Sequence, residues 1–179
     1  ELTRRLLAAE RPPRPGLRWT PAEQWHVTLK FFAAADPDAL TAALDRWTVG
    51  ATGWPPAVAV AGPSARAMGG RLWVVPVAGL DALAAAVDAA TGGLGRNLPD
   101  EQDDTGAPGP GRPFRGHVTL ARARRPAAVR HLPRPDLSVR WQVDCIALVR
   151  SQLGPGGARH DVLRHWPIPP APSAPDESG

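Results

Sequence analysis

One four-residue sequence occurs twice in this chain. The residues His-Val-Thr-Leu at 26–29 return at 117–120, which is 91 positions later in a chain of 179 residues. Both copies lie in strand-like runs. Because the separation is about half of the chain, the repeat predicts that each half supplies one equivalent strand. A pseudo-two-fold axis would relate the two.

Strand geometry gives the repeat a chemical meaning. Side chains alternate between the two faces of a strand, so His26 and Thr28 share one face while Val27 and Leu29 share the other. The second copy has the same pattern. We expect the valines and leucines to enter the core. If the two strands lie side by side, the opposite face holds two imidazoles and two hydroxyls.

Two imidazoles and two hydroxyls suit phosphodiester hydrolysis without a metal ion. A neutral imidazole takes a proton from attacking water, and an imidazolium protonates the departing alkoxide. Histidine has a reference pKa of ~6.5, so both forms exist near neutral pH. Threonine hydroxyls stabilise the charge that develops on the non-bridging oxygens. A single His-x-Thr is usually an ordinary polar pattern on a half-buried strand, but two identical copies favour the catalytic interpretation.

The remaining pattern mixes strands with a few helices and predicts an α+β fold. Apolar spacing and start signals predict helices at residues 1–10 and 81–90, and one that begins at Asp36 with Pro37 in its first turn. We expect a short helix at 126–132 and an exposed, mobile loop at 95–112. Strands are expected at 17–20, 25–32, 57–61, 71–77, 114–122, 137–150 and 158–166.

Composition places the chain among soluble globular proteins. It is 43% hydrophobic and 21% charged, and no apolar run approaches the roughly 20 residues that span a bilayer. No leader segment is evident, so we expect a cytoplasmic protein with no membrane partner. The single cysteine, Cys145, rules out an internal disulfide and four-cysteine zinc sites, and we expect it in the core.

Charge points toward anionic partners. The formal net charge is +4, and Lys30 is the only lysine among 21 basic residues. Arginine offers a fork of donors that suits phosphate oxygens. This balance modestly favours RNA or nucleotide binding.

The segments around the two motifs resemble a known family. Residues 25–32, 112–122 and 148–155 look like the signatures of the two-histidine phosphoesterase superfamily, with its HxTx motifs. Within it, they are most similar to the RNA 2′,3′-cyclic phosphodiesterases, also called 2′-5′ RNA ligases. The resemblance covers roughly residues 6–168.

This resemblance implies a bilobal, pseudo-two-fold α+β fold in which two antiparallel sheets flank a central cleft, with helices outside. It implies an RNA-processing hydrolase that opens 2′,3′-cyclic phosphate ends of RNA or nucleotides to 2′-phosphates, with weak reverse ligation in some members. No cofactor and no metal are implied, and we expect a monomer. By motif position, the implied general base is His117 and the general acid is His26, with Thr28, Thr119, Arg122 and Phe31 as substrate-binding residues.

Strand alternation conflicts with two of these assignments. Phe31 and Arg122 each lie five residues after a histidine and so fall on the opposite face. A bulge or a strand end would have to turn them back. Lys30 falls on the histidine face by alternation, either meeting phosphate or ending a solvated strand.

We expect residues 1–168 to form the phosphoesterase domain and residues 169–179 to be a disordered, proline-rich tail. The strand that usually precedes the first helix in this family is missing from the chain, which would expose a sheet edge. Three further histidines, His131, His160 and His165, are expected at the surface or in packing roles.

Two alternatives remain open. The same chemistry could act on another cyclic phosphodiester, such as an ADP-ribose cyclic phosphate. The chain could instead be a non-catalytic module that binds RNA or nucleotides. Two intact histidines argue against the second alternative, because binding alone needs no proton shuttle.

Overall fold

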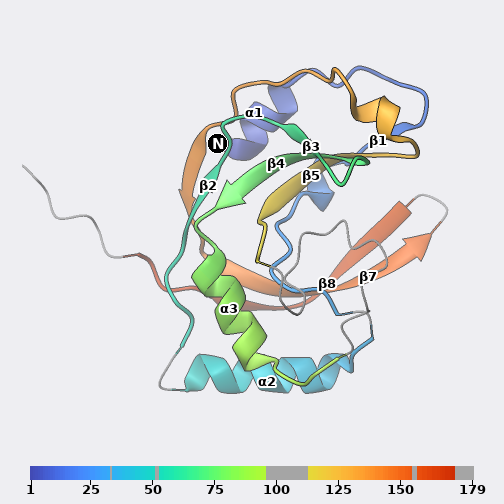
Figure 1. Ribbon diagram of the computed structural model, residues 1–179. Helices are drawn as coiled ribbons and strands as arrows, with labels where there is room; N and C mark the ends of the chain where they lie inside the picture. Colours follow the sequence, from blue (N-terminus) through green and yellow to red (C-terminus); the bar gives the residue numbers. More distant parts are fainter. Residues whose placement is uncertain (33, 51–52, 96–112, 155–156, 172–179) are drawn as a thin grey trace, which may run out of the picture.

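Helices are interspersed among strands along the chain in the computed structural model, which describes all residues except 33, 51–52, 96–112, 155–156 and 172–179 (Figure 1). The helices are α1 (Leu2–Ala8), α2 (Pro37–Val49) and α3 (Asp81–Ala90), with short 3-10 helices η1 (Ala22–Gln24) and η2 (Pro126–Val129). The strands are β1 (Leu17–Trp19), β2 (Val58–Ala61), β3 (Arg66–Met68), β4 (Leu72–Ala78), β5 (His117–Ala123), β6 (Val139–Gln142), β7 (Cys145–Gly154) and β8 (Gly157–Pro167). The α+β prediction is confirmed. The expected loop and most of the expected tail lie outside the described residues.

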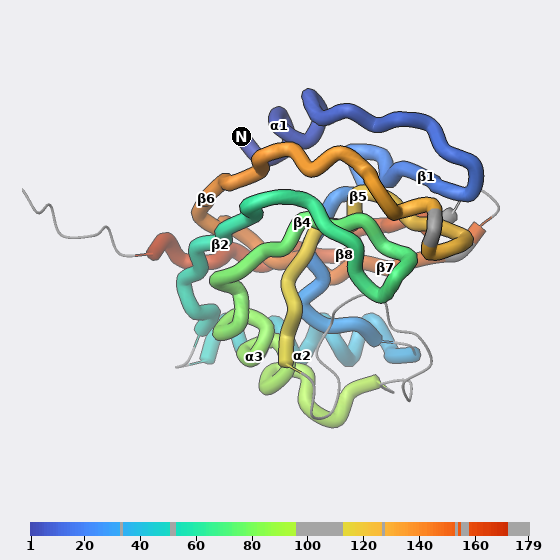
Figure 2. The backbone as a smooth tube through the Cα atoms, turned by 45° about the horizontal axis from the view of Figure 1, so that its top comes forward, coloured from blue at the N-terminus to red at the C-terminus, as the bar shows by residue number. Residues whose placement is uncertain are grey.

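The strands form two antiparallel sheets of unequal size. The larger has the order β1-β5-β4-β2-β6, with β3 also paired to β4, and the smaller is the β7–β8 hairpin. Helix α1 lies at one end of the molecule, and α2 and α3 lie together at the other, with the strands between them (Figures 1 and 2). The paired sheets agree with the predicted architecture.

Helix α2 begins where the sequence predicts. The side chain of Asp36 accepts a hydrogen bond from the backbone N–H of Asp38, and Pro37 occupies the first turn. Leu40 and Leu44 face the core, as apolar residues four positions apart on a helix should. Helix α3 has the predicted bounds.

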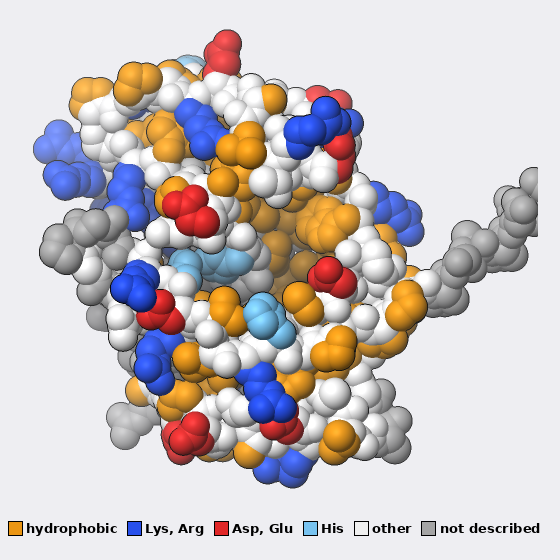
Figure 3. All heavy atoms as spheres, turned by 180° about the vertical axis from the view of Figure 1, so that it is seen from behind, with side chains coloured by type: hydrophobic (Ala, Val, Ile, Leu, Met, Phe, Trp, Pro, Cys, Tyr) orange, Lys and Arg blue, Asp and Glu red, His pale blue; other side chains and the backbone are white. Residues whose placement is uncertain are grey.

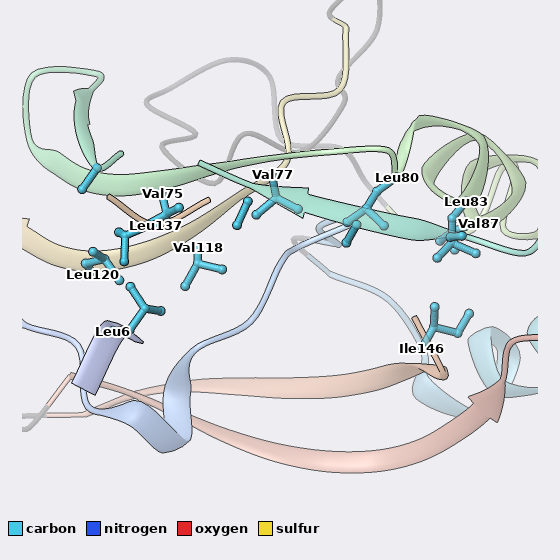
Figure 4. Close-up of a cluster of buried hydrophobic side chains, with 14 of the residues drawn as sticks. Leu6, Val75, Val77, Leu80, Leu83, Val87, Val118, Leu120, Leu137 and Ile146 are labelled. Atoms are coloured by element: carbon cyan, nitrogen blue, oxygen red, sulfur yellow. The ribbon is translucent and has the colours of Figure 1, made fainter. Parts of the chain in front are cut away.

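A continuous apolar core joins the two ends of the molecule. Figure 4 shows it running from Leu6 of α1, past Val75 of β4 and Val118 of β5, to Leu83 of α3 and Ile146 of β7. Val118 is the valine of the second His-Val-Thr-Leu copy and is 4% exposed. One face of that motif therefore enters the core, as expected.

The prediction of a single strand over residues 137–150 is wrong. The chain forms β6, which pairs with β2 in the larger sheet, and then β7, which pairs only with β8. Between them the backbone N–H of Val143 donates to the carbonyl of Ala57, and the carbonyl of Asp144 accepts from Ile168. The chain thus changes sheets at these two residues, and no glycine or proline between residues 139 and 150 marks the change.

The predicted strand at residues 25–32 is also wrong as a regular element. The 3-10 helix η1 follows Pro21, and the chain then returns to β5 through one isolated bridge, Val27 to Val118. Beyond it, the Lys30 ammonium lies 2.7 Å from a carboxylate oxygen of Asp88 on α3. The segment therefore continues the path of β1 along β5 after an interruption. The sequence-based assignments also missed β3 and η1.

Gly116, immediately before β5, is crowded by backbone. Its carbonyl accepts a hydrogen bond of 2.8 Å from the N–H of Val77. A Cβ at residue 116 would meet the carbonyl oxygen of Val77 and lie 3.1 Å from the ring of Phe114.

We therefore expect Gly116→Ala to lower the free energy of unfolding by about 1–3 kcal/mol, because the strand must shift to admit the methyl group. Gly92→Ala is the matched control, since a Cβ there meets only carbonyl oxygens at 3.6 and 3.7 Å, which is ordinary contact. Urea denaturation of both variants measures the difference. Equal stability of the two variants would contradict the crowding.

Candidate active site

The two repeated motifs lie side by side. Val27 and Val118 form an antiparallel bridge, and residues directly opposite in such a bridge point to the same face. In this register His26 lies across from Thr119, and His117 lies across from Thr28. The two valines mark the local two-fold axis, and the imidazoles and hydroxyls share the other face. This is the juxtaposition that the repeat predicts.

Both imidazoles are anchored in the same way. The Nδ1 atom of His26 lies 2.7 Å from the carbonyl oxygen of Gln24, and Nδ1 of His117 lies 2.9 Å from that of Arg115. In each case the carbonyl belongs to the residue two positions earlier. A carbonyl only accepts, so Nδ1 carries the proton. In the neutral ring, Nε2 then has the lone pair and is the atom able to take a proton.

The two histidines differ in exposure. His117 lies in β5 and is 6% exposed, whereas His26 is exposed on the irregular segment after η1. Both threonines, Thr28 and Thr119, are half-buried. Burial disfavours the charged form of an imidazole, and exposure tolerates it. The pair is therefore symmetric in its backbone anchors and asymmetric in its contact with water.

A bulge turns Arg122 toward the histidine face. Along β5, Thr119 pairs with Val74 and Ala121 pairs with Trp73, so Leu120 is an extra residue on that strand. The extra residue reverses the alternation beyond it, which places exposed Arg122 on the face of His117 and Thr119. The conflict between strand alternation and the family resemblance is thereby removed for this residue.

Arg18 is a basic neighbour that the sequence analysis missed. It lies on β1 directly opposite Arg122, and both residues are exposed. Like charges in directly opposed positions repel each other, and an anion between them would relieve this repulsion. Nothing in the sequence distinguishes Arg18 from the other arginines, because only the register brings it beside Arg122.

Phe31 and Lys30 follow the first motif. Phe31 is 42% exposed, and its segment is too irregular for strand alternation to decide its direction. Within the described part of the chain, no ring contact or hydrogen bond joins Phe31 to either histidine. The Lys30 side chain is only 6% exposed and is paired with Asp88, so it holds the segment to α3.

His160 is the other residue that the sequence analysis missed. It lies on β8, and its ring contacts that of His26 edge-on, with centroids 4.8 Å apart and planes at 86°. Its pKa is lowered by partial burial and, to a lesser extent, by the positive charges of His26 and Arg122. The sequence predicts only a surface or packing role for His160. No local pattern indicates that this face of β8 contacts the first motif.

Figure 3 shows histidine side chains in and beside a hollow that hydrophobic side chains border.

Cys145 is exposed, so the prediction that it belongs to the core is wrong. It begins β7, just after the chain has changed sheets. Its pKa is raised by partial burial and then by the neighbouring Asp144. A thiol that stays protonated is a poor nucleophile.

The described residues contain no group of three or more His, Cys, Asp or Glu side chains arranged to hold a metal ion. Over the same residues, no helix is long and apolar enough to cross a membrane.

Comparison with known proteins relates the first third of the sequence to one family. The family model described as LigT like Phosphoesterase matches residues 3–62, which include the first motif. The curated RNA 2′,3′-cyclic phosphodiesterase of Thermus thermophilus is 39% identical over 61 residues, and the match spans 34% of this chain and only 30% of that protein.

Solved structures extend the likeness over most of the chain. The protein TT0787 of Thermus thermophilus is 27% identical, with a TM-score of 0.65 over 86% of this chain and 82% of its own. LigT of E. coli, solved with 3′-AMP, shares the fold at 20% identity and a TM-score of 0.65, over 93% of this chain and 91% of its own. The chain is thus similar to the LigT-like phosphoesterases in sequence over its first third and to their solved structures in fold over most of its length.

Proposed function

We propose that this protein hydrolyses the 2′,3′-cyclic phosphate ends of RNA or nucleotides to 2′-phosphates, using His117 as general base and His26 as general acid. The observation that carries the proposal is the mirrored pair of imidazoles across the Val27–Val118 bridge. Each ring has Nδ1 on a backbone carbonyl. In each neutral ring Nε2 then carries the lone pair, and in the proposed reaction it is the atom that exchanges the proton.

The proposed reaction is a single displacement at phosphorus. Nε2 of neutral His117 takes a proton from water as the water oxygen bonds to phosphorus. The bond from phosphorus to the 3′-oxygen breaks, and protonated His26 gives its proton to that oxygen. A 2′-phosphate and a free 3′-hydroxyl result, and solvent returns the two histidines to their starting states. A 5′-hydroxyl in place of the water would instead form a 2′-5′ linkage.

The two proposed roles fall on rings of different exposure. The proposed general base, His117, is 6% exposed within β5, and the proposed general acid, His26, is exposed on the segment after η1. The hydroxyls of Thr28 and Thr119, each across from a histidine, would donate to the non-bridging oxygens.

The relatives support the substrate class. One is a curated RNA 2′,3′-cyclic phosphodiesterase, and the E. coli protein has been solved with 3′-AMP and with phosphate. The arginines on the histidine face suit the same ligands, because a guanidinium forms charge-assisted hydrogen bonds with phosphate oxygens. We propose Arg122 as a phosphate-binding residue and exposed Phe31 as a surface on which a base stacks.

Replacing either histidine of the pair should abolish turnover. With adenosine 2′,3′-cyclic phosphate and EDTA, we expect His26→Ala and His117→Ala each to lower kcat by on the order of 10²–10⁴-fold, because each removes one proton-transfer group. Chromatography that separates 2′-AMP from 3′-AMP measures the product, which should be 2′-AMP. His131→Asn, away from the paired motifs, is the control and should keep full activity. Full activity in either alanine variant would refute the proposal.

The plot of kcat/KM against pH should be bell-shaped. Activity falls in acid as the base becomes protonated, and it falls in alkali as the acid loses its proton. Because histidine has a reference pKa of ~6.5, we expect the maximum of kcat/KM between about pH 6 and 8. Rates measured over a range of pH in which the protein stays folded provide the check. A rate that rises steadily with hydroxide concentration is incompatible with paired histidines.

Arg122 should contribute to binding more than to proton transfer. We expect Arg122→Ala to raise KM for the cyclic nucleotide on the order of tenfold, as for the loss of one charge-assisted hydrogen bond. Arg140→Ala is the matched control, since Arg140 is an exposed arginine on β6 at the opposite edge of the same sheet. Steady-state kinetics give KM for both variants. An equal KM in the two would show that Arg122 does not bind the substrate.

A further inference from the structure

The chain around His26 is less regular than the chain around His117, although Nδ1 of each ring has the same kind of backbone anchor. His117 lies within β5 and is opposite Pro76 in the ladder with β4. His26 lies between the 3-10 helix η1 and a single bridge at Val27, and its side chain is exposed. An exposed ring on an irregular segment needs a further contact to keep its direction, since sites on loops are less precisely held than sites on strands.

His160 makes such a contact. Its ring lies edge-on to that of His26, with 4.8 Å between centroids and 86° between planes. This distance and angle fall in the range preferred by pairs of aromatic rings. His160 comes from the smaller sheet, so the contact also joins the two sheets at the site.

The strand that carries His160 is itself held in place. His160 pairs with Ser151 across the β7–β8 hairpin. Farther along β8, the indole N–H of Trp166 donates to Asp45 of α2 over 2.8 Å, and Arg164 forms an ion pair of 2.9 Å with the same carboxylate. The hairpin is thus fastened to α2, and it presents His160 to His26 from a fixed support.

We propose that His160 is a positioning residue for the hydrolytic reaction, and that its ring holds the imidazole of His26 in the direction needed to protonate the leaving oxygen. This inference rests on the function proposed above. It adds a third imidazole to a site whose repeated motifs supply two, and it assigns to the small sheet a part in catalysis.

The charge state of His160 suits this role. Its pKa is lowered by burial first, and then by the charges of His26 and Arg122. A neutral ring can lie against protonated His26 without charge repulsion, whereas a second imidazolium would oppose it.

Kinetics of three variants test the proposal. We expect His160→Ala to lower kcat roughly tenfold to a hundredfold, as for a misdirected catalytic group, while KM stays nearly unchanged because substrate contacts remain. His160→Phe keeps an aromatic ring without an ionisable group and should restore most of the loss. His165→Ala is the matched control, since His165 is an exposed histidine on the same strand.

Three kinetic outcomes would overturn the proposal. The first is full activity of His160→Ala. The second is a rise in KM at constant kcat, which would make His160 a substrate-binding residue. The third is a Phe variant as impaired as the Ala variant, which would show that ring packing is not the cause.

A second measurement does not depend on activity. In ¹H–¹³C NMR spectra, the ring signals of His26 should shift in His160→Ala, because the ring current of the neighbour is lost, and should stay in place in His165→Ala. Unchanged His26 signals in His160→Ala would overturn the inference even if the enzyme proves active. The proposed function can also fail on its own. If the wild-type protein turns over no cyclic phosphate but the His26 signals still shift in His160→Ala, the proposed function is refuted and the ring contact is supported.

Discussion

The antiparallel bridge between Val27 and Val118 is the contact on which the site depends. It puts one valine of each motif on the core face, where Val118 is 4% exposed. The flanking histidines and threonines are thereby turned together to the other face. Without this register His26 and His117 would not lie on the same face of neighbouring segments. The bridge between buried Val118 and partly buried Val27 thus sets the register that brings the two histidines to one face.

The sequence alone predicts much of this centre, because the signals are local and repeated. Four-residue identity at two places reveals the two equivalent segments, only one of which is a regular strand, and alternation assigns His117 and Thr119 to one face. Helix α2 follows from the cap at Asp36, and α3 from its apolar spacing before Gly92. In each case the residues that decide the structure are neighbours in the chain.

What sequence reasoning missed depends on pairing between distant strands. The bulge at Leu120, which directs Arg122 to the histidine face, is defined by the register with β4. No local sequence pattern identifies Arg18 or His160. Pairing of β1 with β5 brings Arg18 to the site, and the β7–β8 hairpin brings His160 to the first motif. The exchange of sheets between β6 and β7 is likewise set by hydrogen bonds to Ala57 and Ile168 rather than by a glycine or proline in the sequence. Such features become visible only when the sheets are assembled.

In the proposed reaction the two mirrored imidazoles act on one phosphorus atom. A crystal structure of the protein with 2′-AMP, the product expected from adenosine 2′,3′-cyclic phosphate, tests it most directly. We expect the 2′-phosphate between the rings, with Nε2 of both His26 and His117 within hydrogen-bond distance of its oxygens or of the 3′-hydroxyl. A nucleotide that contacts only one of the two histidines, or that binds away from both, would contradict it.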